Sequence, residues 1–372
     1  MKVLHVSTAK TWRGGEQQLA YLMEELQSQK IEQHIVCLKN SRIDAKAAEL
    51  GISRSYTKKQ TSLSLRFALK IKLTCDQERI SIIHTHDAHA HTFAVWAAQL
   101  FGNRVPIIVS RRVDFPIKTN WLSQLKYNHQ MVKKIICVSD AVKHIAAENL
   151  PINTQEKLAT VYSGIDLKKF DFEPSNKLKE AFNIPASHAL IGNVSALAPH
   201  KDYFTFLDTV KVFFQKHPTT EATFLIIGDG LLKDQLEHYA ASLNVNKHVV
   251  FTGFRSDVTA ILKELDVFLI TSETEGLGTT IIDAMACNVP VVATRAGGIP
   301  ELVIHEKTGL SSNVKNAVDL AENCHRILVD EALRSQLVSN AANHVKGFAK
   351  EVTASLTLNY YREVLRQHKE NS

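Results

Sequence analysis

The feature that most constrains this chain is the stretch 267–300, VFLITSETEGLGTTIIDAMACNVPVVATRAGGIP. Two apolar runs in it, Val267–Ile270 and Pro290–Thr294, predict buried strands. A helical pattern over Thr279–Ala286 lies between them, and a glycine-containing loop follows each strand. The stretch therefore predicts a strand–loop–helix–strand unit with parallel strands, which belongs to an α/β fold.

The first glycine loop predicts a phosphate site. Gly276, Leu277 and Gly278 directly precede the predicted helix, where backbone N–H groups at a helix N-terminus suit a phosphate. Glu275 and Asp283 flank this loop. Carboxylates are poor ligands for phosphate but good ligands for sugar hydroxyls. Because a nucleotide sugar carries hydroxyls on both sides of its diphosphate, we take a nucleotide sugar as the first hypothesis.

The same alternation of strands and helices runs along the whole chain. In the first half, apolar runs that predict strands are Lys2–Ser7, His34–Leu38, Ile80–Ile83, Pro106–Ser110, Ile135–Val138 and Thr160–Tyr162. The pattern restarts after a polar linker and helix at Phe170–Ala186, with runs at Ala189–Val194, Thr223–Ile227 and Val249–Thr252. We therefore expect two doubly wound, Rossmann-like domains, residues 1–168 and 169–351, followed by an amphipathic helix within 352–372.

Length and cysteine content agree with this expectation. A chain of 372 residues is too long for one ordinary domain. Its five cysteines are scattered and form no CxxC pair, which argues against a disulfide framework or a zinc knuckle. The N-terminal apolar run is too short for a signal peptide, and no run reaches the roughly 18 residues of a membrane span. We expect a soluble, cytoplasmic protein.

Charge is unevenly distributed between the halves. Residues 1–168 hold 24 Lys and Arg against 14 Asp and Glu, a net +10, whereas the remainder is net −4. A basic half is compatible with nucleic acid, with an anionic membrane surface or phosphorylated acceptor, or with an ordinary solvated basic face. We expect no nucleic-acid partner, and we expect that any membrane association is peripheral, on the inner membrane face.

Residues of chemical interest cluster where the predicted strands end, which is where ligands bind in open α/β sheets. Lys201 follows a strand and is placed to stabilise a leaving diphosphate, the alternative being a solvated loop lysine. Arg111 and Arg112 are either acceptor-binding residues or surface charge. The other strand-end residues are Gly14, Gly15, His86, Phe254 and Arg255.

Each of these residues also has a purely structural interpretation. The alternative for Glu275 is an acid that complements a helix macrodipole, and Asp283 has apolar neighbours and needs a partner, either a ligand hydroxyl or a buried cation. His86 belongs to a run of four histidines, but no thiolate or carboxylate pattern joins them, so we expect no metal site. The chain also lacks GxxxxGK[ST], GxGxxG after the first strand, and Asp-x-Asp.

Taken together, the motifs resemble those of the family 4 glycosyltransferases, which have the GT-B fold. The resemblance rests on GDG, GF, and SETEGLGTTIIDAMACNVPVVATRAGGIPELV, and it extends to GGEQQ, the His86–Asp87 strand end and YSGID at 162–166. It implies two Rossmann-like domains facing across a cleft, with the C-terminal helix crossing back onto the first domain. It also implies a retaining transfer from a nucleotide-diphosphate sugar to an acceptor, with no cofactor and no metal.

The resemblance assigns roles residue by residue. Glu275 would contact donor sugar hydroxyls, Lys201 would neutralise the diphosphate, and His86 would lie beside the reacting sugar. Asp283 would bind the ribose, and Gly15 would approach the phosphates. The remaining donor-binding residues would be Gly14, Gly276, Leu277, Gly278, Thr279, Thr280, Phe254 and Arg255, with Arg111 and Arg112 as acceptor residues.

Two positions depart from the family pattern. Asp283 stands where the family has Glu, and Ala196 stands where it usually has Arg. The missing cation would then come from Arg13, Arg255 or Arg295. The basic first domain resembles that of enzymes acting on lipopolysaccharide or lipid-linked glycans at a membrane.

Two other functions remain open from the sequence. One is a sugar-nucleotide 2-epimerase of the same fold, which would need no acceptor. The other is a non-catalytic nucleotide-sugar-binding module. The acidic motif and its spacing favour transfer over epimerisation, and the combination of Glu275, Lys201 and His86 argues against the binding module.

Overall fold

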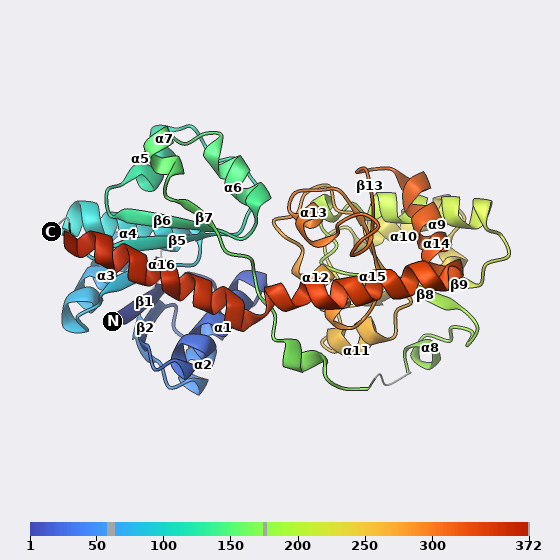
Figure 1. The fold of residues 1–372 in the computed structure, drawn as a ribbon, viewed down its shortest axis with the longest axis horizontal. Coiled ribbons are helices and arrows are strands. Elements are labelled where there is room, and N and C mark those ends of the chain that lie inside the picture. Colours follow the sequence, from blue (N-terminus) through green and yellow to red (C-terminus); the bar gives the residue numbers. More distant parts are fainter. Residues whose placement is uncertain (58–63, 174–176, 371–372) are drawn as a thin grey trace. The chain divides into compact units, whose positions relative to one another are not determined.

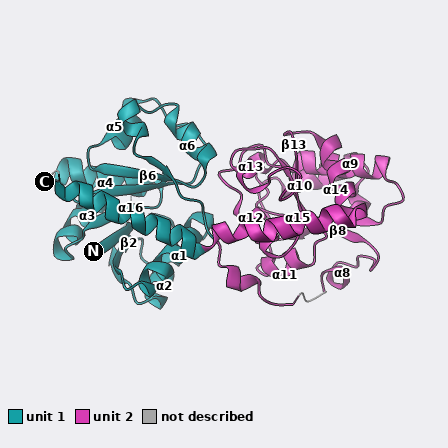
Figure 2. Cartoon of the chain, in the orientation of Figure 1, with its two compact units in different colours: residues 1–164, 350–372 teal, residues 165–349 magenta. Residues whose placement is uncertain are grey.

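The structure is a computed structural model that describes residues 1–57, 64–173 and 177–370. The chain divides into two compact units, shown in different colours in Figure 2. Unit 1 comprises Met1–Gly164 and Lys350–Ser372, and unit 2 comprises Ile165–Ala349. Each unit has its own sheet and its own core (Figure 1).

Within the described residues, unit 1 is built on a seven-stranded sheet in the order β3-β2-β1-β4-β5-β6-β7, and every pairing is parallel. The order reverses between β1 and β4, so the carboxyl ends of these two strands form the topological switch point where such sheets bind ligands. The strands are β1 (Lys2–Val6), β2 (Glu32–Cys37), β3 (Ser53–Tyr56), β4 (Ile82–Thr85), β5 (Ile107–Arg111), β6 (Val132–Cys137) and β7 (Leu158–Thr160).

Helices cover this sheet, and one of them comes from the far end of the chain. The helices are α1 (Gly14–Ser28), α2 (Arg42–Glu49), α3 (Leu65–Gln77), α4 (Ala88–Phe101), α5 (Trp121–Asn128), α6 (Asp140–Ala147), α7 (Ile152–Gln155) and α16 (Lys350–Glu370). Leu358, Tyr361 and Val364 of α16 pack in one core with Val3 and Ile82 of the sheet. The last helix is therefore part of the unit 1 core.

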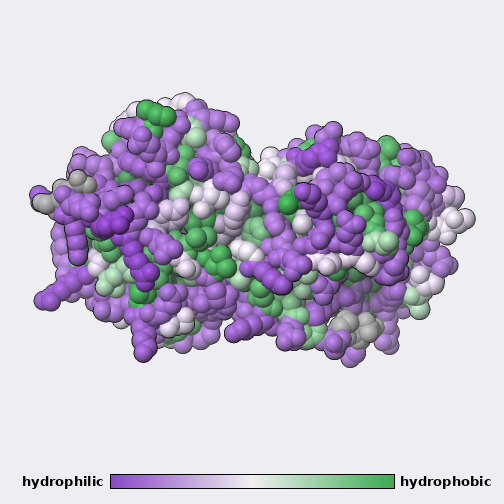
Figure 3. All heavy atoms as spheres, viewed as in Figure 1, coloured by the Kyte–Doolittle hydropathy of each residue, from purple (hydrophilic) through white to green (hydrophobic). Residues whose placement is uncertain are grey.

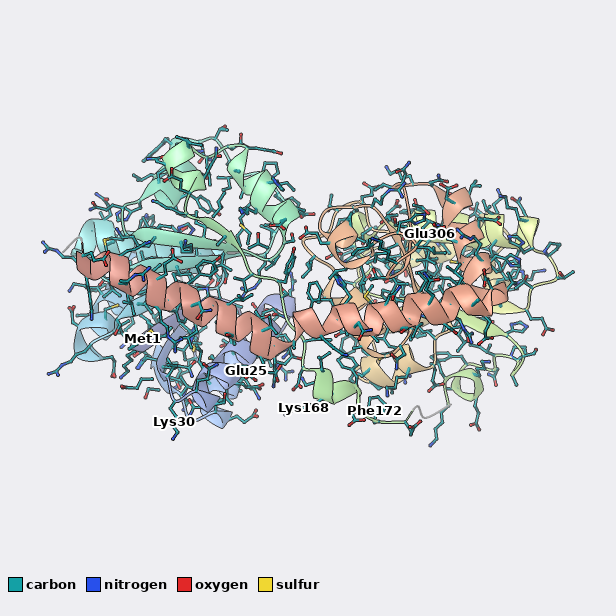
Figure 4. The ribbon with its side chains drawn as sticks, in the orientation of Figure 1. Met1, Glu25, Lys30, Lys168, Phe172 and Glu306 are labelled. Carbon is teal, nitrogen blue, oxygen red and sulfur yellow. The ribbon has the colours of Figure 1, made fainter. Side chains whose placement is uncertain are left out.

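An ion-pair group also ties the start of α16 to α1. Lys350 Nζ lies 3.2 Å from Glu24 Oε2 and 3.5 Å from Glu25 Oε1. Glu25 is labelled in Figure 4, beside the first turns of α16. The charged groups thus add to the apolar packing that holds the C-terminal helix on unit 1.

Unit 2 repeats the same architecture. Its described residues form a six-stranded parallel sheet in the order β10-β9-β8-β11-β12-β13, with the switch point between β8 and β11. The strands are β8 (Ala189–Val194), β9 (Ala222–Ile227), β10 (Val249–Gly253), β11 (Val267–Ile270), β12 (Val291–Thr294) and β13 (Leu310–Ser312).

The helices of unit 2 flank this sheet, and its core includes Tyr203, Phe206, Phe213 and Phe224. The helices are α8 (Leu178–Ala181), α9 (Tyr203–Lys216), α10 (Lys233–Ser242), α11 (Val258–Lys263), α12 (Thr279–Ala286), α13 (Ile299–Leu302), α14 (Ala317–Val329) and α15 (Glu331–His344). Short 3₁₀ turns are η1 (Leu167–Phe170), η2 (Pro199–Lys201), η3 (Asn246–His248) and η4 (Val345–Phe348).

The two-sheet α/β architecture predicted from the sequence is confirmed, but several strand bounds differ; the run expected at Ile80–Ile83, for example, is the strand Ile82–Thr85. The run expected at Thr160–Tyr162 is wrong, because the strand is Leu158–Thr160. The strands Ser53–Tyr56 and Leu310–Ser312 were not expected, since one has no apolar run and the other is three residues long. Of the expected linker and helix at Phe170–Ala186, residues 174–176 lie outside the described part of the chain.

Among the helices that the structure describes, none combines the length and apolarity that a bilayer span requires.

Candidate active site

In unit 2, the loops after β8 and β11 meet at the switch point of the sheet. The Glu273 N–H donates to the carbonyl of His200 (2.9 Å), and the Thr271 hydroxyl donates to the carbonyls of Lys201 (3.2 Å) and Asp202 (2.9 Å). These bonds bring Lys201 beside Glu275, and the two side chains form an ion pair. Both are mostly buried, with side-chain exposures of 15% and 16%.

Glycines let other loops approach the two that carry this pair. A Cβ at Gly297, which has φ +50°, would lie 2.0 Å from the carbonyl oxygen of Glu275. A Cβ at Gly228, with φ +147°, would lie 2.0 Å from the carbonyl oxygen of Ser195. Since no Cβ can approach an oxygen that closely, only glycine fits at either position, and each supports the backbone of a strand-end loop.

The loop after β11 leads into α12. Gly278 is the N-cap of this helix with φ +91°, a left-handed conformation that favours glycine. Leu277 is buried, so it anchors the loop, while Thr279 and Thr280 open the first turn. The N–H groups of a first helical turn lack partners within the helix, so this turn can donate hydrogen bonds to an anion.

Asp283 lies one turn into α12, on its fifth residue. Burial raises the pKa of its carboxyl group from 3.8 to about 7, and the charge of Lys169 acts in the opposite direction. Burial therefore favours the protonated form of this carboxyl group at pH values where an exposed aspartate is fully ionised. A ligand hydroxyl that hydrogen-bonds to the carboxylate would favour the ionised form.

The loop after β10 carries Phe254 and Arg255. Phe254 is 79% exposed, and Arg255 pairs with Asp257 through two contacts of 2.8 and 2.5 Å. Arg295 donates to the carbonyl of Ser311 (3.1 Å). Two of the three arginines considered as substitutes for the cation absent at Ala196 are thus already engaged within unit 2.

In unit 1, the switch point holds Gly14, Gly15 and His86. The two glycines open α1, immediately after the loop that leaves β1. A Cβ at Gly14 would meet nothing within 4 Å of the described chain, and one at Gly15 would lie 3.9 Å from Arg112 Cδ. Packing within unit 1 therefore does not demand glycine here, which leaves room for a ligand to approach the backbone.

Asp87 fixes the strand end that carries His86. Its carboxylate accepts from the Thr8 N–H (2.6 Å) and hydroxyl (2.8 Å), and it caps α4 by accepting from the N–H groups of His89 and Ala90. The loop after β1 and the start of α4 are thereby joined at one side chain.

Arg111, the last residue of β5, and Arg112, which follows it, also point into the protein. Arg112 donates to the carbonyl of His86 (3.0 Å), and burial lowers the pKa of Arg112 to about 10. Arg111 is buried, and its guanidinium donates to the Tyr127 hydroxyl (3.1 Å) and to the carbonyl of Phe115. Arg111 therefore holds the segment before α5 in place, whereas Arg112 lies between His86 and Gly15.

His86 is part of a buried histidine cluster that sequence reasoning missed. His5 Nδ1 lies 3.0 Å from His86 Nε2, and His84 is hydrogen-bonded to Tyr361 (2.6 Å) and Ser110 (2.8 Å). Burial lowers the pKa of His86 and His84 well below the usual value, and that of His5 to about 4. The signal in the sequence was the presence of a histidine, His5 and His84, inside each of two apolar strands.

Comparisons with known proteins show which proteins this chain is similar to. The family model for group 1 glycosyl transferases matches residues 174–344, and the model for Glycosyltransferase Family 4 matches residues 12–169. The chain is 26% identical over 311 residues, 82% of its length and 80% of the relative's, to an N-acetyl-alpha-D-glucosaminyl L-malate synthase of Bacillus anthracis.

A second relative, from Escherichia coli, is a UDP-Gal:alpha-D-GlcNAc-diphosphoundecaprenol alpha-1,3-galactosyltransferase. It is 25% identical over 284 residues, 73% of this chain and 72% of the relative. A solved structure of Anabaena HepE in complex with UDP and glucose superposes with a TM-score of 0.82 at 21% identity, covering 98% of this chain and all of that one. The two matching models, the relatives and the paired parallel sheets lead to one conclusion: the chain belongs to the family 4 glycosyltransferases of the GT-B fold and is a glycosyl-transferring enzyme.

Proposed function

We propose that the protein transfers a sugar, with retention of its anomeric configuration, from a nucleotide-diphosphate sugar to a glycan or lipid-linked acceptor. The observation that carries this proposal is the pairing of Lys201 with Glu275 beside the N-terminus of α12. The site thus offers a cation and helix N–H groups for a diphosphate, next to a carboxylate for hydroxyls.

In this mechanism the donor diphosphate lies at the first turn of α12. Lys201 leaves or shares its pair with Glu275 and stabilises the charge that develops on the leaving diphosphate. Glu275 then accepts hydrogen bonds from donor sugar hydroxyls, and Asp283 accepts from the ribose. A leaving-group oxygen takes the proton of the attacking acceptor hydroxyl on the same face of the sugar, so retention needs neither an enzymic nucleophile nor a metal.

The relatives and a hollow in unit 1 support the acceptor class that we propose. One relative acts, by its name, on a diphosphoundecaprenol-linked sugar, as does a Campylobacter jejuni relative that is 26% identical over 261 residues. In unit 1, a hollow of about 350 Å³ lies between α4 and α5, lined by apolar and polar groups that include Trp96, Leu122, Leu125, Thr92 and Lys118. We place the acceptor in this hollow, and the pathway in lipopolysaccharide or surface polysaccharide synthesis.

A peripheral membrane contact fits the same region. Trp121 is 71% exposed, Phe115 63% and Ile152 74%. Figure 3 shows apolar side chains at the surface at the upper end of unit 1, where Figure 1 places α5 and α7. Residues 115–134 contain four lysines and no acidic residue. Exposed aromatic groups beside lysines suit an anionic bilayer interface.

One set of assays tests the proposal. UDP, GDP and ADP sugars are first screened for binding. The protein is then incubated with the nucleotide sugar that binds and a diphosphoprenyl-linked acceptor, with and without EDTA. NMR identifies the anomeric configuration of the product. Transfer with a retained anomer in EDTA supports the proposal, whereas an inverted anomer or loss of activity in EDTA contradicts the mechanism. Turnover of donor without acceptor would instead indicate an epimerase.

A separate experiment tests the membrane contact. The protein should co-sediment with anionic but not with neutral vesicles, and salt and Trp121→Ser should each weaken this binding.

A further inference from the structure

The side chains behind His86 form a hydrogen-bonded series that starts at Gln33. Gln33 Nε2 donates to the carbonyl of Met23 (3.0 Å), and its Oε1 lies 3.1 Å from His5 Nε2. His5 Nδ1 lies in turn 3.0 Å from His86 Nε2. Gln33, His5 and His86 are 7%, 0% and 8% exposed, so water does not replace these bonds.

The chemistry of the groups sets a direction along the series. The Met23 carbonyl can only accept, so the Gln33 NH₂ must face it, and the Gln33 oxygen must face His5. An amide oxygen can only accept, so His5 carries its proton on Nε2. Neutral His5 then has a lone pair on Nδ1, and the bond to His86 forms only if His86 carries its proton on Nε2.

The last residue of the series, His86, has one ring nitrogen that takes no part in it. With its proton on Nε2, neutral His86 has a lone pair on Nδ1. This atom is buried and has no hydrogen-bond partner among the described residues. It belongs to the residue after β4, at the switch point beside β1, and its backbone is fixed by Arg112 and by the Val6 carbonyl. A buried acceptor without a partner is costly, so a hydroxyl that donates to this atom would be favoured there.

We propose that Gln33 and His5 are positioning residues that hold His86 as its Nε2–H tautomer, so that the His86 Nδ1 lone pair accepts a hydrogen bond from a hydroxyl of a sugar bound at the switch point of the unit 1 sheet. This inference rests on the proposed function for the identity of the hydroxyl, but not for the tautomer. The opposite tautomer would present an N–H to the hydroxyl and break the contact with His5.

A metal site is the competing interpretation of the same cluster. One nitrogen from each of His5, His84 and His86 lies within 4.8 Å of the others. However, the nitrogens of His5 are engaged by Gln33 and His86, and those of His84 by Tyr361 and Ser110. Binding a metal with all three would break several of these bonds, whereas the tautomer series keeps every one of them.

The first test reads the tautomer directly, without any substrate. In full-length protein labelled with ¹⁵N-histidine, long-range ¹H–¹⁵N correlation spectra report which ring nitrogen carries the proton, and His86→Asn assigns the signal. We expect wild-type His86 to be protonated on Nε2. Protonation on Nδ1, or stoichiometric Zn²⁺ binding that His5→Leu removes, would overturn the proposal.

The second test uses paired variants. His5→Leu removes the acceptor for His86, so we expect a mixture of His86 tautomers and a loss of roughly 2- to 10-fold in kcat/KM, the effect of one neutral hydrogen bond. His5→Asn supplies an amide oxygen in place of Nδ1 and should restore both. An unchanged tautomer in His5→Leu, or no recovery in His5→Asn, would contradict the series.

Two further variants guard against misfolding and indirect effects. Gln33→Met removes the acceptor for His5 without altering a histidine, so we expect it to release the His5 tautomer and to lower the fraction of His86 that is protonated on Nε2. The matched control is His34→Leu, because His34 is also buried on β2 but bonds to Ser55 (3.0 Å), outside the series. It should leave the His86 tautomer unchanged. If the tautomer follows these expectations but no sugar is transferred, the proposed function fails and the positioning series stands.

Discussion

Lys201 and Glu275, which are 74 positions apart in the sequence, form an ion pair at the switch point of the second sheet. The pair neutralises two charges that are mostly shielded from water, so each side chain is costly to remove alone. A donor diphosphate and donor hydroxyls would give each partner a second interaction. If the donor binds here as proposed, the resting pair would keep both groups in place until it does.

From this pairing we expect that Lys201→Ala and Glu275→Ala each lower kcat by about 10²–10³-fold, the usual effect of losing one charge-stabilising group. The fold should persist, as judged by circular dichroism. The control is Lys315→Ala, because Lys315 pairs with Glu273 (3.0 Å) in the same unit but is well exposed. If either site variant kept near wild-type kcat, its assigned role would be wrong.

Gly297 should tolerate no side chain. In Gly297→Ala the new Cβ would overlap the Glu275 carbonyl oxygen, so the loop must move, with an expected loss of about 1–3 kcal/mol in the free energy of unfolding. The rate of sugar transfer should fall by more than the loss of stability explains, because the Glu275 side chain moves with its backbone. Gly347→Ala is the control, since nothing lies within 4 Å of its Cβ. Urea unfolding and donor titration measure both effects, and equal stability of the two variants would contradict this prediction.

Asp283 should make stability depend on pH. Its pKa is raised from 3.8 to about 7, so between these values the native state retains a proton that the unfolded chain has lost. Wild-type stability should therefore fall relative to Asp283→Asn as pH rises from 4 to 7, and the difference should be constant above that. Urea midpoints across this range provide the measurement, and a pH-independent difference would contradict the shift.

Donor affinity should change with pH in the opposite sense. If the ribose hydroxyls donate to the Asp283 carboxylate, wild-type binding weakens as pH falls through about 7, because the carboxyl group becomes protonated. Asp283→Asn should bind the donor more weakly than wild type at pH 8 but with a flat pH dependence. Asp283→Ala should likewise lose mainly donor affinity rather than kcat. Calorimetric titration at several pH values tests this, and unchanged affinity in both variants would exclude the ribose contact.

A substitution of Gly15 should affect stability and enzyme activity differently. It lies in the first turn of α1 with no close neighbour, so Gly15→Ala should leave stability unchanged or raise it by up to about 1 kcal/mol. If phosphates approach this backbone, the added methyl group should still weaken donor turnover. Thermal unfolding and steady-state kinetics on the same sample make the comparison. Full activity with unchanged KM would show that no ligand approaches Gly15.

Much of the architecture could be predicted from the sequence, because buried parallel strands are continuous apolar runs and the loops that follow them begin with recognisable residues. The stretch 267–300 predicted β11, α12 and β12 together with the glycine loops between them. The edge strand β3 could not be found this way, since SRSY is largely exposed and carries no apolar run.

What the sequence by itself determined was therefore local: which segments form strands and helices, and which polar residues stand at their ends. Only the tertiary structure decided which of those residues meet. Strand order places His5 of β1 beside His86 after β4, and it brings the Lys201 loop to Glu275. The raised pKa of Asp283 also arises from burial by the folded chain. The hydrophobic periodicity of a sequence indicates the helix or strand to which a residue belongs. The ion-pair partner, the histidine tautomer and the side-chain pKa depend instead on neighbours that are distant in the sequence.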